Sequence, residues 1–158
     1  MKPYIDLKTA EALANEYVDN AIKVFKENVK NSELNDLLFD CFKKPEIIWK
    51  KRGFRIAGSY MPYSNLINMN INYLYSKDAE RFIKNTVVHE LAHAINRVYF
   101  GSKHDKQWKY ICKLMNYPAN IYHNYSLPEN KPVPKKKLIS FPVFKKFCLK
   151  INTFWCFS

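Results

Sequence analysis

The chain contains two histidines and a glutamate in a spacing that suits metal-assisted hydrolysis. His89, Glu90 and His93 form an H-E-x-x-H motif within an apolar stretch from Thr86 to Ile95. On a helix, residues four apart share a face, so the imidazoles of His89 and His93 can bind one zinc ion. Glu90 is turned away from the metal but stays close enough to act on a water held there. The motif therefore predicts hydrolysis of a peptide bond by a metal-activated water, with Glu90 as the general base.

The flanking residues predict that the motif lies on a buried helix. Apolar residues surround the two histidines on nearly every side of this helix: Val87, Val88, Leu91, Ala92, Ala94 and Ile95. A helix that is apolar nearly all round is typical of a protein core. Because buried imidazole and carboxylate groups need partners, a bound metal ion is favoured over a surface helix that carries the motif by accident.

A third ligand has to come from elsewhere in the chain, since catalytic zinc usually has three protein ligands and one open position. Only two acidic residues follow Glu90, namely Asp105 and Glu129, so a downstream glutamate ligand would have to be Glu129. The alternative is His104, one of the four histidines. Gly101 predicts the end of the motif helix, and a chain reversal there would bring His104 beneath the first two histidines. We predict His104 as the third ligand.

Apolar periodicity predicts three main helices. The first is amphipathic and covers residues 9–30. The second carries the motif and runs from Ser76 or Asp78 to about Phe100. The third covers residues 105–115 and ends before Pro118. Its buried residues are expected to be Trp108, Ile111, Cys112 and Met115.

Three shorter segments predict strands. One begins at residues 47–49, and a second covers residues 54–60 with an interruption near Gly58. In residues 66–72 apolar residues alternate with asparagines, which is typical of a half-buried strand with one wet face. An edge strand can bind a substrate peptide as an added strand. The polar face of this strand is therefore a candidate border of the active site, formed by Asn68, Asn70 and Asn72. We therefore expect an α+β fold in which a small antiparallel or mixed sheet packs on three helices.

Positive charge is concentrated in the second half of the chain. Residues 91–158 hold 12 Lys/Arg and 2 Asp/Glu, whereas residues 1–90 hold 14 and 12, which gives net charges of +10 and +2. Such a half attracts a polyanion such as DNA. Prolines, a lysine triplet and many aromatic residues follow one another after residue 126. We predict a protease domain over residues 1–126 and a linker with a basic aromatic tail over 127–158. The tail either clamps phosphates and stacks on bases or packs on the core.

The composition favours a protein of the cytoplasm, or of the nucleus in a eukaryotic or viral setting. No apolar run resembles a signal peptide, and no uncharged stretch is long enough to span a bilayer. The four cysteines contain no C-x-x-C pair and are expected to be buried thiols in a reducing compartment: Cys41, Cys112, Cys148 and Cys156.

Residues 49–123 resemble the SprT-like, or Spartan-type, metalloprotease family. Residues 87–94 are similar to the zinc helix of that family, and residues 101–108 to its Gly-x-x-His segment with a following aromatic residue. Residues 119–123 are similar to the short run that follows the next helix. The resemblance covers about half of the chain.

The resemblance implies a zincin-like core in which His89, His93 and His104 bind Zn²⁺ and Glu90 is catalytic. It also implies substrates that are bound or crosslinked to DNA, and hence a role in DNA–protein crosslink repair. Many members carry a Cys-rich zinc ribbon after the protease core. Only two cysteines occur in the corresponding region here, so a second structural zinc is not expected.

The sequence supports three hypotheses, with a zinc endopeptidase that acts near DNA as the first. The second is a nucleic-acid-binding module in which the metal is structural and proteolysis is absent. The third is a cytoplasmic peptidase that cleaves a protein regulator without DNA. A hydrolase also needs a donor for the developing oxyanion, for which Tyr122 and His123 are candidates. Asp105 either orients an imidazole or caps the third helix.

Overall fold

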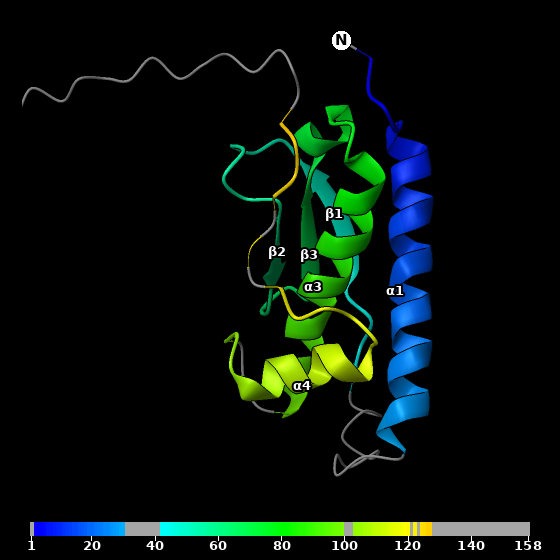
Figure 1. Cartoon of the computed structure of the whole chain (residues 1–158), viewed down its shortest axis with the longest axis vertical. Helices are drawn as coiled ribbons and strands as arrows, with labels where there is room; N and C mark the ends of the chain where they lie inside the picture. Colours follow the sequence, from blue (N-terminus) through cyan, green and yellow to red (C-terminus); the bar gives the residue numbers. More distant parts are fainter. Residues whose placement is uncertain (1, 31–41, 100–102, 121, 123, 128–158) are drawn as a thin grey trace, which may run out of the picture.

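Helices and strands occur in the order α1 (Leu7–Val29), β1 (Glu46–Lys50), β2 (Gly58–Met61), β3 (Leu66–Asn70), the 3-10 helix η1 (Ile71–Tyr75), α3 (Ala79–Tyr99) and α4 (Lys106–Leu114) (Figure 1). The computed structural model describes residues 2–30, 42–99, 103–120, 122 and 124–127. The predicted α+β class, with three α-helices and a small sheet, is confirmed for this part of the chain.

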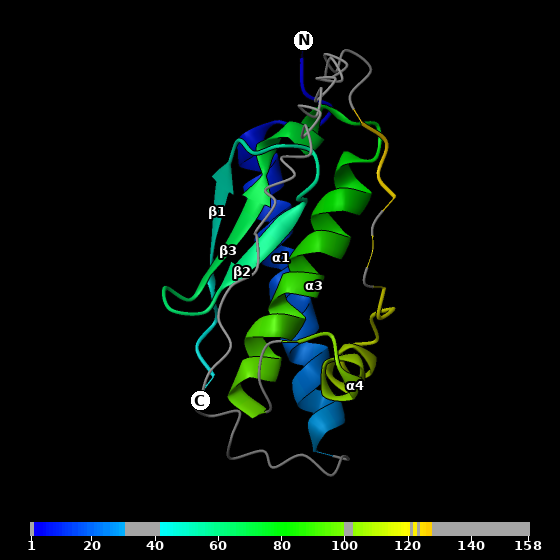
Figure 2. The ribbon, with the colours of Figure 1, turned by 90° about the vertical axis from the view of Figure 1, so that its left-hand side faces the viewer.

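The sheet is mixed and has the order β1-β3-β2. β1 pairs with β3 in parallel, with Ile47 opposite Ile67, and β2 pairs with β3 in antiparallel, with Tyr60 opposite Ile67. Within the described residues, β2 therefore forms one edge of the sheet. Figure 2 shows the sheet on one side of α3, with α1 alongside the helix and α4 across its C-terminal half.

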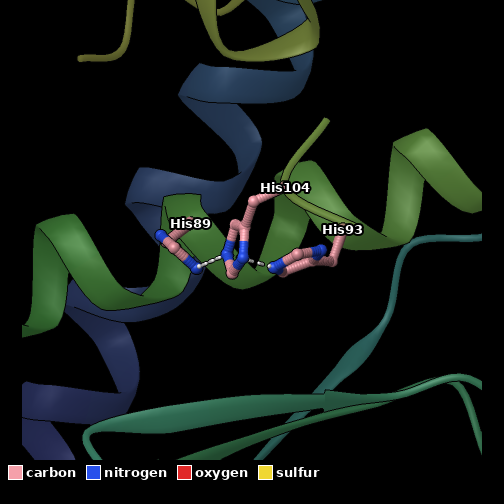
Figure 3. Close-up of side chains that lie close together, drawn as sticks. All are labelled: His89, His93 and His104. Atoms are coloured by element: carbon pink, nitrogen blue, oxygen red, sulfur yellow. Dashed lines mark hydrogen bonds between the residues drawn. The ribbon is translucent and has the colours of Figure 1, made fainter. Parts of the chain in front are cut away.

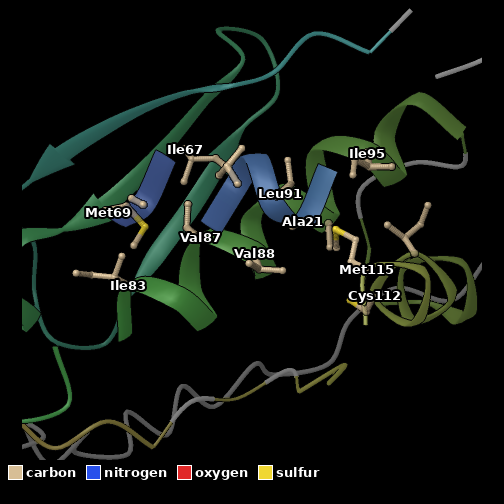
Figure 4. Close-up of a cluster of buried hydrophobic side chains, with 14 of the residues drawn as sticks. Ala21, Ile67, Met69, Ile83, Val87, Val88, Leu91, Ile95, Cys112 and Met115 are labelled. Atoms are coloured by element: carbon tan, nitrogen blue, oxygen red, sulfur yellow. The ribbon is translucent and has the colours of Figure 1, made fainter. Parts of the chain in front are cut away.

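The core lies where α1, the sheet and α4 all meet α3. Ile83, Val87, Leu91 and Ile95 of α3 are fully buried or nearly so, and Figure 4 shows them between the strand residues and the other helices. α1 contributes buried small residues such as Ala10 and Ala14 to this core. Each buried aliphatic side chain contributes about 1.5–3 kcal/mol relative to an exposed one. The predicted burial of the motif helix is confirmed.

The third helix has the predicted position and buried face. The Asp105 carboxylate accepts a hydrogen bond from the Trp108 N–H at 2.9 Å, so Asp105 caps α4. Trp108, Ile111, Cys112 and Met115 are all buried. Asn116 has a φ of 53°, the left-handed conformation that ends many helices.

The prediction that the asparagines of residues 66–72 face solvent is wrong. Asn68 and Asn70 are buried, and β3 is the central strand and not an edge. The Asn70 amide donates to the carbonyl oxygens of Gly53 at 3.1 Å and Ile56 at 2.8 Å, and its oxygen accepts from the Arg52 N–H at 3.3 Å. The Asn70 side chain thus binds backbone N–H and carbonyl groups of a neighbouring turn. The alternation of apolar residues and asparagines in the sequence does not reveal this role.

The predicted second strand also has the wrong bounds. β2 begins at Gly58, where the sequence suggested an interruption, and Phe54 and Ile56 belong to the turn held by Asn70. A Cβ on Gly58 would clash with Thr86 Cγ2 and would lie 3.3 Å from Glu90 Cγ. Glycine is therefore needed because β2 runs so close to α3.

Several sequence predictions concern residues outside the described part of the chain: Cys41, Gly101, His123, Glu129, Cys148, Cys156 and the tail after Leu127. The proposed boundary between a protease domain and a tail stays a prediction. Across the described residues, no helix combines the length and the apolar character needed to cross a membrane.

Candidate metal centre

Three histidines from two neighbouring segments meet at one point. His89 and His93 project from the same face of α3, as their spacing of four predicts, and His104 comes from the segment just before α4. Its Nε2 lies 2.9 Å from Nε2 of His89 and 3.0 Å from Nε2 of His93. Figure 3 shows the His104 ring between the other two. No other group of three potential ligands is found among the described residues.

This donor set fits a zinc ion. Zinc–nitrogen bonds of 2.0–2.1 Å in a tetrahedral site place ligand nitrogens about 3.3 Å apart, close to the separations found here. Burial lowers the pKa of His104, against the opposing effect of the Asp105 carboxylate. The neutral imidazole is the form that binds metal. Three histidines also leave one tetrahedral position open, as in catalytic zinc sites.

One aromatic side chain contacts all three imidazoles. The Trp108 ring centroid lies 4.9 Å from that of His89, 5.5 Å from that of His93 and 4.6 Å from that of His104. Trp108 is fully buried on α4, whose first turn is fixed by the Asp105 cap. The buried indole therefore restricts the orientation of all three rings.

Glu90 lies beside the histidines but is held by the sheet. Glu90 is only 8% exposed, and its Oε2 accepts a hydrogen bond from the backbone N–H of Tyr60 at 2.7 Å. Burial raises the pKa of Glu90 to about 7, although the hydrogen bond from Tyr60 opposes the shift. A carboxyl group with a pKa near neutrality can both accept and return a proton, as a general base requires.

A cavity of about 630 Å³ opens over the histidines and Glu90. α3 provides its floor, and β2 with the preceding turn lines one side. The segment after α4 runs back along α3 and lines the other side (Figure 2). Tyr117 in this segment donates to the Asn85 carbonyl at 2.8 Å, and Tyr125 accepts from the Thr86 hydroxyl at 3.3 Å. The cavity is large enough for several side chains of a bound peptide.

Four predicted site residues, His89, Glu90, His93 and His104, lie together in the cavity, but other residues that line it were not predicted. Tyr60, Arg55 and Arg81 were not singled out, because nothing in their local sequence marks them. Of the two oxyanion candidates, Tyr122 lines the cavity and is 90% exposed, and His123 lies outside the described residues. Asp105 caps α4, which was one of its two predicted roles.

Comparison with known proteins gives one family and several relatives. The model of the SprT-like family matches residues 28–128. Proteins named Protein SprT are similar, one from Pseudomonas putida at 32% identity over 90 residues, or 54% of each chain. Another from Vibrio atlanticus is 36% identical over 89 residues, which cover 54% of this chain and 52% of the relative. One from Pseudomonas fluorescens is 31% identical over 110 residues, 60% and 66% of the two chains.

The matched region spans roughly half to two thirds of these relatives' own length. No solved structure matches the chain significantly.

Proposed function

Because the chain belongs to the SprT-like family, we propose that it is a zinc-dependent endopeptidase with a zincin-like catalytic core. One observation carries the proposal, namely the meeting of three histidine Nε2 atoms beside a buried glutamate on the floor of a cavity. His89, His93 and His104 are the proposed ligands. When bound, zinc supplies a Lewis acid that polarises a peptide carbonyl and lowers the pKa of a water.

Glu90 is the proposed general base. Its carboxylate takes a proton from the attacking water and later passes that proton to the leaving amine. The Tyr60 N–H binds Oε2 and so orients the carboxylate of Glu90, a residue that lines the cavity. A base held by a backbone group needs no rearrangement before it acts, so the geometry favours proton transfer.

Substitution of Glu90 by Gln tests the function. The variant should bind zinc with unchanged stoichiometry, since Glu90 is not a proposed ligand, and should lose at least about 100-fold in peptide cleavage, the typical contribution of a general base. Metal analysis and hydrolysis of an unstructured protein such as casein measure the two properties. Full cleavage by the variant would exclude Glu90 as the base, and no cleavage by the zinc-loaded native chain would contradict the endopeptidase.

We also propose that the substrates are proteins bound or crosslinked to DNA. The net charge of +10 in residues 91–158 supports this class, because a basic half-chain concentrates the enzyme on a polyanion. Two alternatives remain distinct from it: a nucleic-acid-binding module with a structural metal, and a peptidase that cleaves a protein regulator without DNA.

An assay with and without DNA separates these possibilities. Cleavage of a DNA-bound protein that rises when single-stranded or duplex DNA is added, and falls steeply with salt, supports the proposal. Equal cleavage without DNA supports the peptidase of a regulator. Salt-dependent DNA binding without any cleavage by the zinc-loaded chain supports the binding module.

A further inference from the structure

Two arginines line the same cavity as the proposed zinc ligands. Arg55 comes from the turn before β2, and Arg81 comes from the first turn of α3. Glu90 is the only acidic side chain among the described residues that line this cavity. The cavity wall therefore carries positive charge that the histidine site does not require.

The two backbone segments that carry the arginines are linked near the beginning of α3. Phe54 and Phe82 pack on the ring of Tyr73, with centroid distances of 6.0 and 4.9 Å. Arg55 directly follows Phe54, and Arg81 directly precedes Phe82. The common contact with Tyr73 thus joins the two backbone segments at the end where α3 begins, two helical turns before the proposed zinc ligands.

The two guanidinium groups differ in how far they are neutralised. Arg55 is exposed and forms no ion pair within the described part of the chain. The turn that carries Arg55 is held by Asn70, whose side-chain amide donates a hydrogen bond to the carbonyl of Ile56. Arg81 pairs with Asp78 at 3.1 Å, donates to the side-chain and backbone oxygens of Asn124 at 3.3 and 3.5 Å, and lies over the ring of Tyr125, but its side chain is still 47% exposed. A guanidinium has five N–H donors, so Asp78 and the two oxygens of Asn124 leave donors of Arg81 for a further acceptor.

The position of Arg81 on α3 gives its distance from the histidines along a bound peptide. Arg81, Asn85, His89 and His93 follow one another at intervals of four along α3, and all four line the cavity. Eight helical residues separate Arg81 from His89, a rise of about 12 Å. An extended peptide advances about 3.3 Å per residue, so Arg81 lies three or four residues from a bond held at the histidines, and Arg55 lines the same cavity.

We propose that Arg55 and Arg81 form a subsite for an acidic side chain of the substrate, three or four residues from the cleaved bond. Arginine binds carboxylates through paired N–H donors, and such charge-assisted bonds are about twice as strong as neutral ones. A peptide substrate is favoured over a nucleic-acid backbone as the occupant, because the arginines share one cavity with the groups that act on the peptide bond. The inference rests on the proposed endopeptidase function and adds a specificity to it.

Cleavage mapping tests the subsite on the zinc-loaded full-length chain. Denatured casein and a proteome-derived peptide library are digested, and the cut sites are read by mass spectrometry. Asp and Glu should be enriched at least about threefold at the third or fourth residue on one side of the cut. The variants Arg55→Gln and Arg81→Gln should lose this enrichment, and Arg55→Glu should replace it with Lys and Arg. Lys23→Gln, which removes an exposed charge on α1 far from the cavity lining, should retain it.

Peptide binding provides a second measurement that does not need turnover. The zinc-loaded Glu90→Gln variant is titrated with two labelled ten-residue peptide pools that differ only in one Asp or Asn. The acidic pool should bind about fivefold more tightly, and an added Arg55→Gln should remove the difference. Arg55 makes no ion pair in the described structure, so its loss should not disturb folding.

The outcomes separate the subsite from the proposed function. If the native chain cuts nothing but the acidic pool binds more tightly through Arg55, the endopeptidase fails and the subsite stands. Cut sites and binding without any acidic preference would overturn the subsite while leaving the endopeptidase intact. A third outcome would reassign the arginines to nucleic-acid phosphates. In that case an oligothymidine would displace the peptides, its own binding would need Arg55, and the peptides would show no acidic preference.

Discussion

The backbone N–H of Tyr60, at the edge of the sheet, donates a 2.7 Å hydrogen bond to the carboxylate of Glu90 on α3. The strand that lies nearest to the cavity thus also holds the proposed catalytic base. The close approach depends on Gly58, whose hydrogen faces Thr86 and Glu90. Activity should therefore depend on the distance between β2 and α3 as well as on the histidines.

Gly58→Ala should separate catalysis from zinc binding. The new methyl group meets Thr86 Cγ2 and pushes β2 away from α3, which weakens the Tyr60–Glu90 hydrogen bond. We expect a fall in kcat of about 10-fold or more, unchanged zinc stoichiometry, and a loss of about 1–3 kcal/mol in the free energy of unfolding. Steady-state kinetics, metal analysis and urea unfolding measure these effects.

Two variants control for the alanine itself. Gly53→Ala places a methyl group where nothing lies within 4 Å, and it should keep full activity. Thr86→Ser removes the methyl group that Gly58→Ala meets, so the double variant should recover part of the lost kcat. A double variant as impaired as Gly58→Ala would show that the strand–helix contact does not explain the effect.

His104→Ala should remove the third proposed zinc ligand. We expect zinc affinity to fall by more than about 100-fold, beyond the 10–100-fold effect of losing a group that only supports a ligand. Competition with a chromogenic chelator measures the affinity. His123→Ala, which changes a histidine outside the predicted ligand set, should retain zinc. Equal zinc content in both variants would reject the assignment of His104.

Asn70→Ala should destabilise the chain although it removes no apolar contact. The carbonyl groups of Gly53 and Ile56 would lose the amide that binds them, which we expect to cost about 2–3 kcal/mol in the free energy of unfolding. Asn15→Ala, at an exposed position of α1, should change this free energy by less than about 0.5 kcal/mol. Urea unfolding that finds the two variants equally stable would contradict the proposed role of Asn70.

Asp78 should give the chain an acid-sensitive stability. Hydrogen bonds from Ser126, together with the ion pair to Arg81, hold the pKa of Asp78 at about 2, below its ordinary value of 3.8. Because the folded pKa is the lower one, this stabilisation is complete above about pH 5 and is lost as the pH falls toward 2. Unfolding by urea should thus show a steeper decline between pH 5 and 2 for the native chain than for Asp78→Asn. Parallel declines would indicate that Asp78 makes no such contribution.

The sequence by itself determined the candidate metal centre. A spacing of four residues places His89 and His93 on one helical face, and this local geometry does not depend on the rest of the fold. The scarcity of histidines and acids after Glu90 then left His104 as the preferred third ligand. The third helix could also be predicted, because the Asp105 cap and the apolar spacing of its face are local signals.

Only the tertiary structure decided what surrounds that centre. Asn68 and Asn70 alternate with apolar residues as on a half-wet strand, yet both are buried because β3 lies between two other strands and Asn70 binds a distant turn. Tyr60 lies 30 residues before Glu90 in the chain, and Arg55 lies 26 before Arg81. Strand order and helix packing bring Tyr60 to Glu90 and place both arginines in the lining of one cavity, and local periodicity carries no information on either.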